Sequence, residues 1–425
     1  MMLRIYNAKI WTGERYMECG ELWTEDGHIR HVGEIVPLIL LPWDREIDAK
    51  GNLIMPSFKN SHAHSPMVCL RSQADDMALE DWLFKQVFPR EGKLTPDDCY
   101  WLTRLAVLEY LSSGMSVVSD MYFHLECIAD ACVDSGFRNV IMEGVTEGNL
   151  CGLDKKLQDG IDRLDGKGGL IEYRIGLHAE YTNSEKSIRA LADFAKAKKL
   201  PTYTHLCETK KEVEECVQRH GKTPAVYLAE QGMFEYGGGA YHFVHSTDDD
   251  IKVLKERGVS VVSCPASNLK LASGIAPLKK YSDSGLNIAL GTDGPASNNC
   301  LDMFREMFLS TGLQKGLLYD PSAISGIDVL NMATSNGAVA MGLDSMDSIE
   351  IGKAADFIMI DLHQPNMQPI NNPLNNLVYA ASKANVLMTV VNGAVRYEKG
   401  EYFVGEDVDR IYQKCQDITD RIMER

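Results

Sequence analysis

The 425-residue sequence predicts an α/β fold: a (β/α)8 TIM-type barrel with a small β-sheet domain formed from both chain ends. Three observations support it: eight short apolar runs rich in β-branched residues, amphipathic segments between them, and short strand-like segments at both ends. Eight such units in about 290 residues match the size of a barrel with insertions. The predicted barrel strands are 53–58, 116–121, 138–143, 173–178, 201–205, 240–244, 260–263 and 287–291.

Amphipathic segments between the apolar runs predict the crossover helices that parallel strands require. The clearest of these helices are 96–113, 125–135, 184–198, 248–257 and 301–315. Gly114 and Gly258 follow two of them, where a glycine ends a helix readily. We therefore expect the barrel to span residues 53–351.

The two ends of the chain have a different pattern, with short strands and turns. Strand-like segments are 2–7, 29–33, 356–361 and 386–393. Chain termini in compact proteins often lie close together. We therefore expect residues 1–52 and 352–425 to form one composite β domain.

Composition argues against several classes of function. Sixty acidic against 43 basic residues give a net charge of −17, which would repel a nucleic-acid backbone. No apolar stretch approaches the ~18 residues of a membrane span, and residues 1–7 show no signal peptide. Eleven cysteines without a C-x-x-C pair fit reduced thiols. We expect a cytoplasmic protein that binds a small molecule, with no nucleic-acid or membrane partner and with homo-oligomer formation left open.

The strongest chemical signal is the triplet His62-Ala63-His64, which follows the first predicted strand closely. Residues i and i+2 of an extended chain point to the same side, so both imidazoles can reach one ion. Barrels of this type carry their chemistry at the carboxyl ends of the strands. An H-x-H pair on its own would more often belong to a surface loop.

Three more polar residues stand at or near the ends of predicted strands, namely His205, His242 and Asp293. Three imidazoles and one carboxylate suit a borderline-soft divalent ion. The set contains no cysteine, which favours a catalytic over a structural site. The sequence therefore predicts a divalent metal centre, with Zn²⁺ as the first choice and Fe²⁺ as the alternative.

With these motifs the chain resembles the amidohydrolase superfamily, and within it the 5'-methylthioadenosine and S-adenosylhomocysteine deaminases. The resemblance covers essentially the whole chain, and it rests on segments 55–67, 205–209, 264–271 and 290–299. It implies a single ion held by His62, His64, His205 and Asp293. Some members hold two ions bridged by a carboxylated lysine, but the fourth predicted strand here ends in His178 and offers no such lysine.

The resemblance also implies residues that act on the substrate. Glu208, His242 and Asp293 would be catalytic, and Glu91 and His178 would contact the substrate together with Glu208 and Asp293. Glu208 could carry protons to a ring nitrogen and to the departing amine, Asp293 could accept a proton from water, and His242 could orient that water. Glu91 could bind the vicinal hydroxyls of a ribose. The implied activity is hydrolytic release of ammonia from the adenine ring of a nucleoside.

The 5' substituent of that nucleoside depends on Glu143, at the end of the third predicted strand. Deaminases of S-adenosylhomocysteine tend to carry an arginine there, which suits the substrate's carboxylate. Two facing carboxylates would repel each other. We therefore expect Glu143 to contact the substrate and to favour adenosine, 5'-deoxyadenosine or 5'-methylthioadenosine over S-adenosylhomocysteine.

Two alternative functions stay open at this point. One keeps the site and changes the ring, giving a guanine-type, pterin or triazine aminohydrolase. The other is a non-catalytic scaffold of the same fold, against which the complete ligand set argues. His245 is expected to be structural or to contact a site residue, Trp82 to lie in the core, and the role of His124 is undecided.

Overall fold

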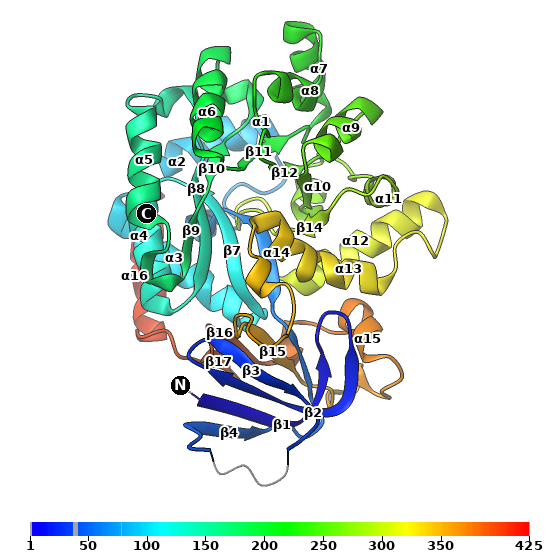
Figure 1. Cartoon of the computed structure of the whole chain (residues 1–425). Helices are drawn as coiled ribbons and strands as arrows, with labels where there is room; N and C mark the ends of the chain where they lie inside the picture. The colour runs from blue at the N-terminus through cyan, green and yellow to red at the C-terminus, as the bar shows by residue number, and fades with distance from the viewer. Residues whose placement is uncertain (1, 37–40, 78, 425) are drawn as a thin grey trace.

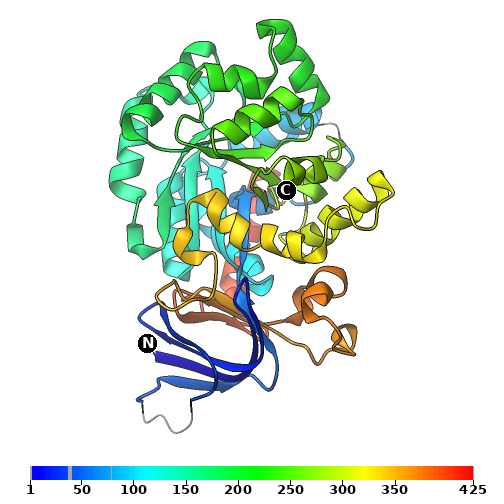
Figure 2. The same ribbon diagram turned by 45° about the vertical axis from the view of Figure 1, so that its right-hand side comes forward.

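The structure is a computed structural model, and it describes residues 2–36, 41–77 and 79–424. Parallel strands surrounded by helices occupy the middle of the chain, and a sheet built from both chain ends lies to one side of them (Figures 1 and 2). None of the described helices is long and apolar enough to cross a lipid bilayer.

The central strands run parallel in two sheets. One sheet contains β6 (Phe58–Ala63), β7 (Met115–Tyr122), β8 (Arg138–Glu143) and β9 (Ile171–Tyr173), and the other contains β10 (Ile175–Leu177), β11 (Thr202–Leu206), β12 (Gly238–His242), β13 (Val259–Ser263) and β14 (Ile288–Leu290). Nearly all of their residues are buried, as expected for parallel strands covered by helices. Seven of the eight predicted strands coincide in large part with one of these strands, and the eighth, 53–58, shares only Phe58 with β6.

Helices follow the parallel strands and cover them (Figure 1). They are α3 (Pro96–Ser112), α4 (Leu125–Ser135), α5 (Leu153–Leu164), α6 (Glu185–Lys198), α7 (Lys210–His220), α8 (Pro224–Glu230), α9 (Asp248–Glu256), α10 (Pro265–Lys270), α11 (Leu278–Asp283), α12 (Met303–Leu318), α13 (Gly326–Met332) and α14 (Ser335–Met341). All five predicted helices are among them, with ends shifted by few residues. Before α3 the chain forms one more helical segment, which consists of α1 (Leu79–Asp81), a π-helix (Trp82–Val87) and α2 (Phe88–Glu91).

Strands from both chain ends share one nine-stranded sheet. Its path runs through β18 (Glu401–Tyr402), β17 (Ala394–Glu398), β16 (Val386–Val391), β15 (Phe357–Ile360), β5 (Leu53–Pro56), β1 (Met2–Trp11), β2 (Tyr16–Glu25) and β3 (His28–Gly33), with β4 (Arg45–Asp48) paired to β1. The assignment of 53–58 as the first barrel strand was wrong, because β5 pairs with β1 and β15. The first parallel strand, β6, begins after Ser57. A continuous apolar run predicts a buried strand but not its sheet.

The sequence pattern at the C-terminal end also missed two helices, α15 (Pro373–Tyr379) and α16 (Val408–Ile422). Helix α16 packs against α3. Its buried residues are Ile411, Cys415, Ile418 and Ile422. This spacing follows one face of a helix, so the signal was present in the sequence.

Lys59 of β6 is fully buried, and its ammonium donates hydrogen bonds to the carbonyl and hydroxyl oxygens of Ser57, each at 2.9 Å. Burial lowers the pKa of Lys59 from 10.5 to about 8, although Asp356 opposes this shift. Below pH 8 the buried amine is charged in the folded protein, and the cost of burying this charge lowers the free energy of unfolding by its full amount. That cost disappears as the pH rises towards 10.5, where lysine of the unfolded chain also loses its proton.

We predict that the stability of the wild-type protein, measured against Lys59→Met, improves by up to about 3 kcal/mol between pH 8 and 10.5. Thermal or urea unfolding of both proteins across this range measures the difference, because effects common to both cancel. A difference that stays constant with pH would contradict the shifted pKa of this amine.

Candidate active site

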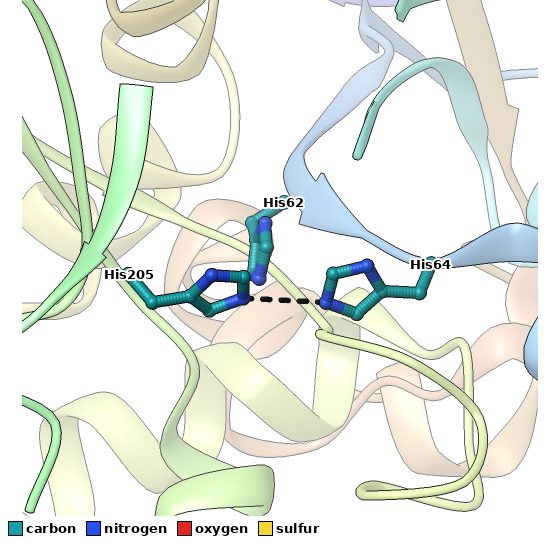
Figure 3. Close-up of side chains that lie close together, drawn as sticks. All are labelled: His62, His64 and His205. Atoms are coloured by element: carbon teal, nitrogen blue, oxygen red, sulfur yellow. Dashed lines mark hydrogen bonds between the residues drawn. The ribbon is translucent and has the colours of Figure 1, made fainter. Parts of the chain in front are cut away.

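The sequence-predicted histidines meet at the carboxyl ends of the parallel strands. His62 belongs to β6 and His64 follows it, while His205 lies near the end of β11 and His242 ends β12. Figure 3 shows the imidazoles of His62, His64 and His205 pointing toward one another. Asp293 follows β14 and completes the group. All five residues are buried.

Backbone carbonyls fix the proton positions on two of these imidazoles. The Nδ1 of His64 lies 2.6 Å from the carbonyl oxygen of Met121, and the Nδ1 of His205 lies 2.7 Å from that of His178. A carbonyl can only accept, so each Nδ1 must donate, which leaves a lone pair on each Nε2 of a neutral ring. The two Nε2 atoms are 3.3 Å apart (Figure 3). Two lone pairs cannot face each other at this distance, so either one ring carries a second proton and donates to the other, or a cation lies between them.

His62 and Asp293 complete a donor set for that cation. Both ring nitrogens of His62 are buried without a hydrogen-bond partner in the described part of the chain, and unsatisfied buried groups of this kind are uncommon unless an ion or ligand engages them. The Oδ1 of Asp293 lies 3.3 Å from His64 Nε2 and 3.6 Å from His62 Nε2. The nitrogens of His62, His64 and His205 lie within 4.8 Å of one another. These residues therefore fit one divalent ion, as predicted.

Charge couples His64 to Asp293. Burial lowers the pKa of His64, but the hydrogen bond and the charge of Asp293 outweigh it and raise that pKa to about 9. Burial likewise disfavours ionised Asp293, yet the hydrogen bond from His64 and the charges of the surrounding histidines hold its pKa well below the usual range. The carboxylate thus attracts a positive charge into the cluster. A divalent ion can take the place of the proton that the pair otherwise holds.

Glu208 and His242 lie beside the cluster. Their side chains approach to 3.9 Å between His242 Nε2 and Glu208 Oε2, and the hydroxyl of Ser273 contacts the other oxygen of Glu208 at 3.4 Å. Burial raises the pKa of Glu208, and the charge of His242 only partly offsets this. A carboxyl that keeps its proton toward neutral pH can serve as a general acid. His245 contacts Ser273 in turn, because its Nε2 lies 2.7 Å from the carbonyl oxygen of Ser273.

The cluster borders a cavity of about 700 Å³, a volume typical of sites for small molecules. Glu91 of α2 and His178 line it, and so do Trp82 and His124, whose roles the sequence left as core or undecided. The cavity wall also includes Glu208, His242, Asp293, His64, His205, Phe84, Phe88, Tyr122, Phe123 and Tyr181. The hydroxyl of Tyr122 donates to Glu91 Oε1 at 2.5 Å, and burial raises the pKa of Glu91.

Comparison with known proteins decides the family. The sequence pattern described as the amidohydrolase family matches residues 53–396. The chain belongs to the amidohydrolase family. This membership confirms the resemblance, and the predicted hydrolase class with it.

Three amidohydrolases cover nearly the whole chain. A 5-methylthioadenosine/S-adenosylhomocysteine deaminase of Caldanaerobacter subterraneus subsp. tengcongensis is 39% identical over 98% of this chain and 97% of its own length. A 5'-deoxyadenosine deaminase of Methanopyrus kandleri is 35% identical over 99% of each chain. The crystal structure of an adenosine deaminase from Xanthomonas campestris with bound zinc is 30% identical, has a TM-score of 0.92, and covers 100% of this chain and 99% of that one.

Three residues that the sequence did not single out hold Asp293 by hydrogen bonds in this amidohydrolase. Ser267 and Ser297 donate to Oδ2 of Asp293 at 2.5 and 2.7 Å, and the amide of Gly294 donates to Oδ1 at 2.7 Å. Two hydroxyl donors on Oδ2 hold the carboxylate so that Oδ1 turns toward the histidines. Both serines lie in motif segments that carried the resemblance, but a motif gives no orientation of a side chain.

Glu143, which the sequence predicted to contact the substrate, does not line the cavity of this amidohydrolase. It ends β8 and is half-buried beside Gly144, which lines the cavity. Burial raises the pKa of Glu143, and Lys156 and His124 act against this rise. Its contact with a substrate therefore stays a prediction.

Proposed function

We propose that this amidohydrolase is a zinc-dependent hydrolytic deaminase that releases ammonia from the adenine ring of adenosine, 5'-deoxyadenosine or 5'-methylthioadenosine. The proposal depends on one observation: the buried cluster of His62, His64, His205 and Asp293, with Glu208 beside it, borders a cavity large enough for a nucleoside. The names of the relatives at 35 to 39% identity support the adenine nucleoside, and the zinc bound in the Xanthomonas enzyme supports the metal.

The residues divide the chemistry between them. When bound, a divalent ion supplies the Lewis acidity that makes water a nucleophile near neutral pH. Asp293 accepts one proton from the attacking water, and Glu208 gives its proton to a ring nitrogen. Glu208 then takes the second proton from the added oxygen and passes it to the exocyclic amine, which leaves as ammonia. The proton on Asp293 finally restores the acid form of Glu208.

The substrate's sugar and ring would fill the rest of the cavity. Glu91 brings two carboxylate oxygens to the cavity wall, and a ribose offers two vicinal hydroxyls as donors. His178 lines the same wall and lies 6.2 Å from Phe88 between ring centroids. Aromatic side chains around a purine provide apolar contact area without charge.

The cavity wall also bears on the 5' substituent. Among its described lining residues there is neither lysine nor arginine. A carboxylate-bearing tail would enter this wall without a cationic partner, which is costly in a partly buried site. This supports neutral 5' groups and disfavours S-adenosylhomocysteine.

Glu143 allows this preference to be tested. We predict that Glu143→Arg raises the specificity constant for S-adenosylhomocysteine relative to 5'-methylthioadenosine, by about 1 to 3 kcal/mol if the new pair is shielded from water. Both substrates are measured on wild type and variant, so that a general loss of folded enzyme cancels. An unchanged ratio would show that Glu143 does not reach the 5' end of the substrate.

We further propose that the two parallel sheets close into one eight-stranded barrel. Only Arg174 separates β9 from β10, and a parallel bridge joins Val145 to Leu177. At the other edge, the amide of Asp293 donates to the carbonyl of His62 at 3.0 Å. Residues 53–351 would form this barrel, and residues 1–52 and 352–425 a composite β domain, which the shared sheet of both chain ends supports.

The compartment and assembly are proposals as well. All eleven cysteines are free thiols in the structure, which supports the reducing cytoplasm. The sequence leaves homo-oligomer formation open, and size-exclusion chromatography with light scattering would measure the assembly state.

A nucleoside panel with metal analysis on the same sample tests the proposed function. Ammonia release is measured for adenosine, 5'-deoxyadenosine, 5'-methylthioadenosine, S-adenosylhomocysteine, guanine, a pterin and an amino-triazine. We expect turnover of the first three and about one zinc ion per chain. Turnover of guanine, the pterin or the triazine instead would establish the alternative ring, and a protein without stoichiometric metal or turnover would establish a scaffold.

A further inference from the structure

We infer that Asn268 is a positioning residue that fixes the tautomer of His242, so that the Nε2 of this imidazole presents a lone pair to the reacting centre. The inference rests on the proposed function for its catalytic meaning. The hydrogen-bond geometry that carries it is independent of which substrate is used.

Asn268 is held rigidly beside the site. It lies on α10, directly after β13, and is almost fully buried. Its amide donates to the carbonyl of Cys264 at 3.0 Å, and its own carbonyl accepts from the amide of Ser273 at 2.8 Å. The backbone on both sides of the side chain is thus fixed. The preceding residue, Ser267, is one of the two serines that hold Asp293.

The side chain of Asn268 makes one polar contact that bears on catalysis. Its Oδ1 lies 2.8 Å from Nδ1 of His242. An amide oxygen can only accept, so Nδ1 of His242 carries the proton and donates. The neutral ring then has its lone pair on Nε2.

That Nε2 faces the chemistry. It lies 3.9 Å from Oε2 of Glu208. His242 also belongs, through one of its ring nitrogens, to a group with His62 and Asp293 whose potential ligand atoms lie within 4.8 Å of one another. A lone pair at this place can accept a hydrogen bond from the attacking water or from the acid form of Glu208. The opposite tautomer would present an N–H there instead and could only donate.

The amide nitrogen of Asn268 strengthens this assignment of a special role. Nδ2 is buried without a hydrogen-bond partner within residues 2–36, 41–77 and 79–424. Buried donors are normally satisfied, and a side chain that served packing alone would not need this one. The hydrogen bond between Oδ1 and His242 Nδ1 is therefore the polar contact that explains why an asparagine occupies this buried position.

The test compares two isosteric variants of the zinc-loaded enzyme. Asn268→Asp keeps an acceptor opposite Nδ1, whereas Asn268→Leu keeps the shape and removes it. We expect Asn268→Leu to retain zinc, to keep KM within about threefold and to lose about 10²-fold in kcat, the scale of one oriented hydrogen bond in a site. Asn268→Asp should lose clearly less. Equal losses in both variants would overturn the proposal.

A double-variant comparison separates positioning from general packing. If Asn268 acts through His242, Asn268→Leu should cost little further activity in a His242→Gln background. Asn385 provides the matched control. It is a buried asparagine on the short helix 383–385, and it does not line the cavity. Asn385→Leu should lower the melting temperature and leave kcat per bound zinc unchanged. An equally large kcat loss in the His242→Gln background would contradict action through His242.

The tautomer itself can be read without turnover. Long-range ¹H–¹⁵N spectra of histidine-labelled, zinc-loaded protein distinguish a protonated from an unprotonated ring nitrogen, and His242→Gln assigns the signal. We expect protonated Nδ1 and unprotonated Nε2 in the wild type, with a change in Asn268→Leu. A protonated Nε2 in the wild type would overturn the inference. Failure of every nucleoside to react would defeat the proposed function alone, because this readout needs no substrate.

Discussion

Asp293→Ala is expected to remove zinc and deaminase activity together. The variant loses the carboxylate whose Oδ1 lies 3.6 and 3.3 Å from the Nε2 atoms of His62 and His64. It also removes the group that we propose accepts a proton from the attacking water. Removing only an outer partner of a metal ligand typically costs 10- to 100-fold. We therefore expect the loss for Asp293→Ala to exceed about 10²-fold in both metal affinity and turnover.

Metal content per chain and ammonia release on the same preparation measure this effect. His62→Ala should behave in the same way, because both of its ring nitrogens are buried without a hydrogen-bond partner in the described part of the chain and are thus free to bind an ion. Ser297→Ala is the graded control, since it keeps Asp293 and removes one of the two hydroxyls on Oδ2. Full metal and full activity in either alanine variant of a ligand would contradict the assignment.

The metal cluster could be predicted because its signal is local. His62 and His64 are two residues apart on an extended chain, and His205 and Asp293 stand near the carboxyl ends of apolar runs. Parallel strands bring such ends to one edge, whatever the details of the helices between them. The structure accordingly gathers these residues without any exact strand boundary being needed.

The contacts that orient the cluster could not be predicted in the same way. Ser267, Ser297 and Asn268 hold Asp293 and His242 through side-chain hydrogen bonds. Ser267 and Asn268 lie on α10 after β13, and Ser297 follows β14. The direction of a hydroxyl depends on a rotamer that no periodicity encodes. Position after a strand would have made all three residues candidates, but it would not have assigned partners.

Errors in the fold have a physical cause as well. The segment Leu53–Pro56 is as apolar as a barrel strand, yet it pairs with strands from both chain ends, so its sheet was decided by pairing partners distant in sequence. Helix α16 was missed for a different reason. Its mean hydropathy is low, and only the spacing of its few buried residues reveals the apolar face.

Glu208→Gln should separate proton transfer from metal binding. Glutamine has nearly the same shape and can still accept from Ser273, which lies 3.4 Å from Oε1 of Glu208, but it has no acidic proton to give. Burial raises the pKa of Glu208, so the wild-type side chain holds its proton to a higher pH than an exposed glutamate does. We expect zinc to be retained at wild-type content while kcat falls by about 10² to 10⁴, the range of general acid–base catalysis.

A change of leaving group sharpens this prediction. Chloride leaves without being protonated, whereas an amine must take up a proton to leave as ammonia. The ratio of wild-type to Glu208→Gln turnover should therefore be smaller for 6-chloropurine ribonucleoside than for adenosine. Zinc content, kcat on both nucleosides and nucleoside binding are measured on one preparation of each protein. If the variant instead lost its zinc, Glu208 would be a ligand of the ion, and equal ratios for both nucleosides would show that it does not protonate the departing amine.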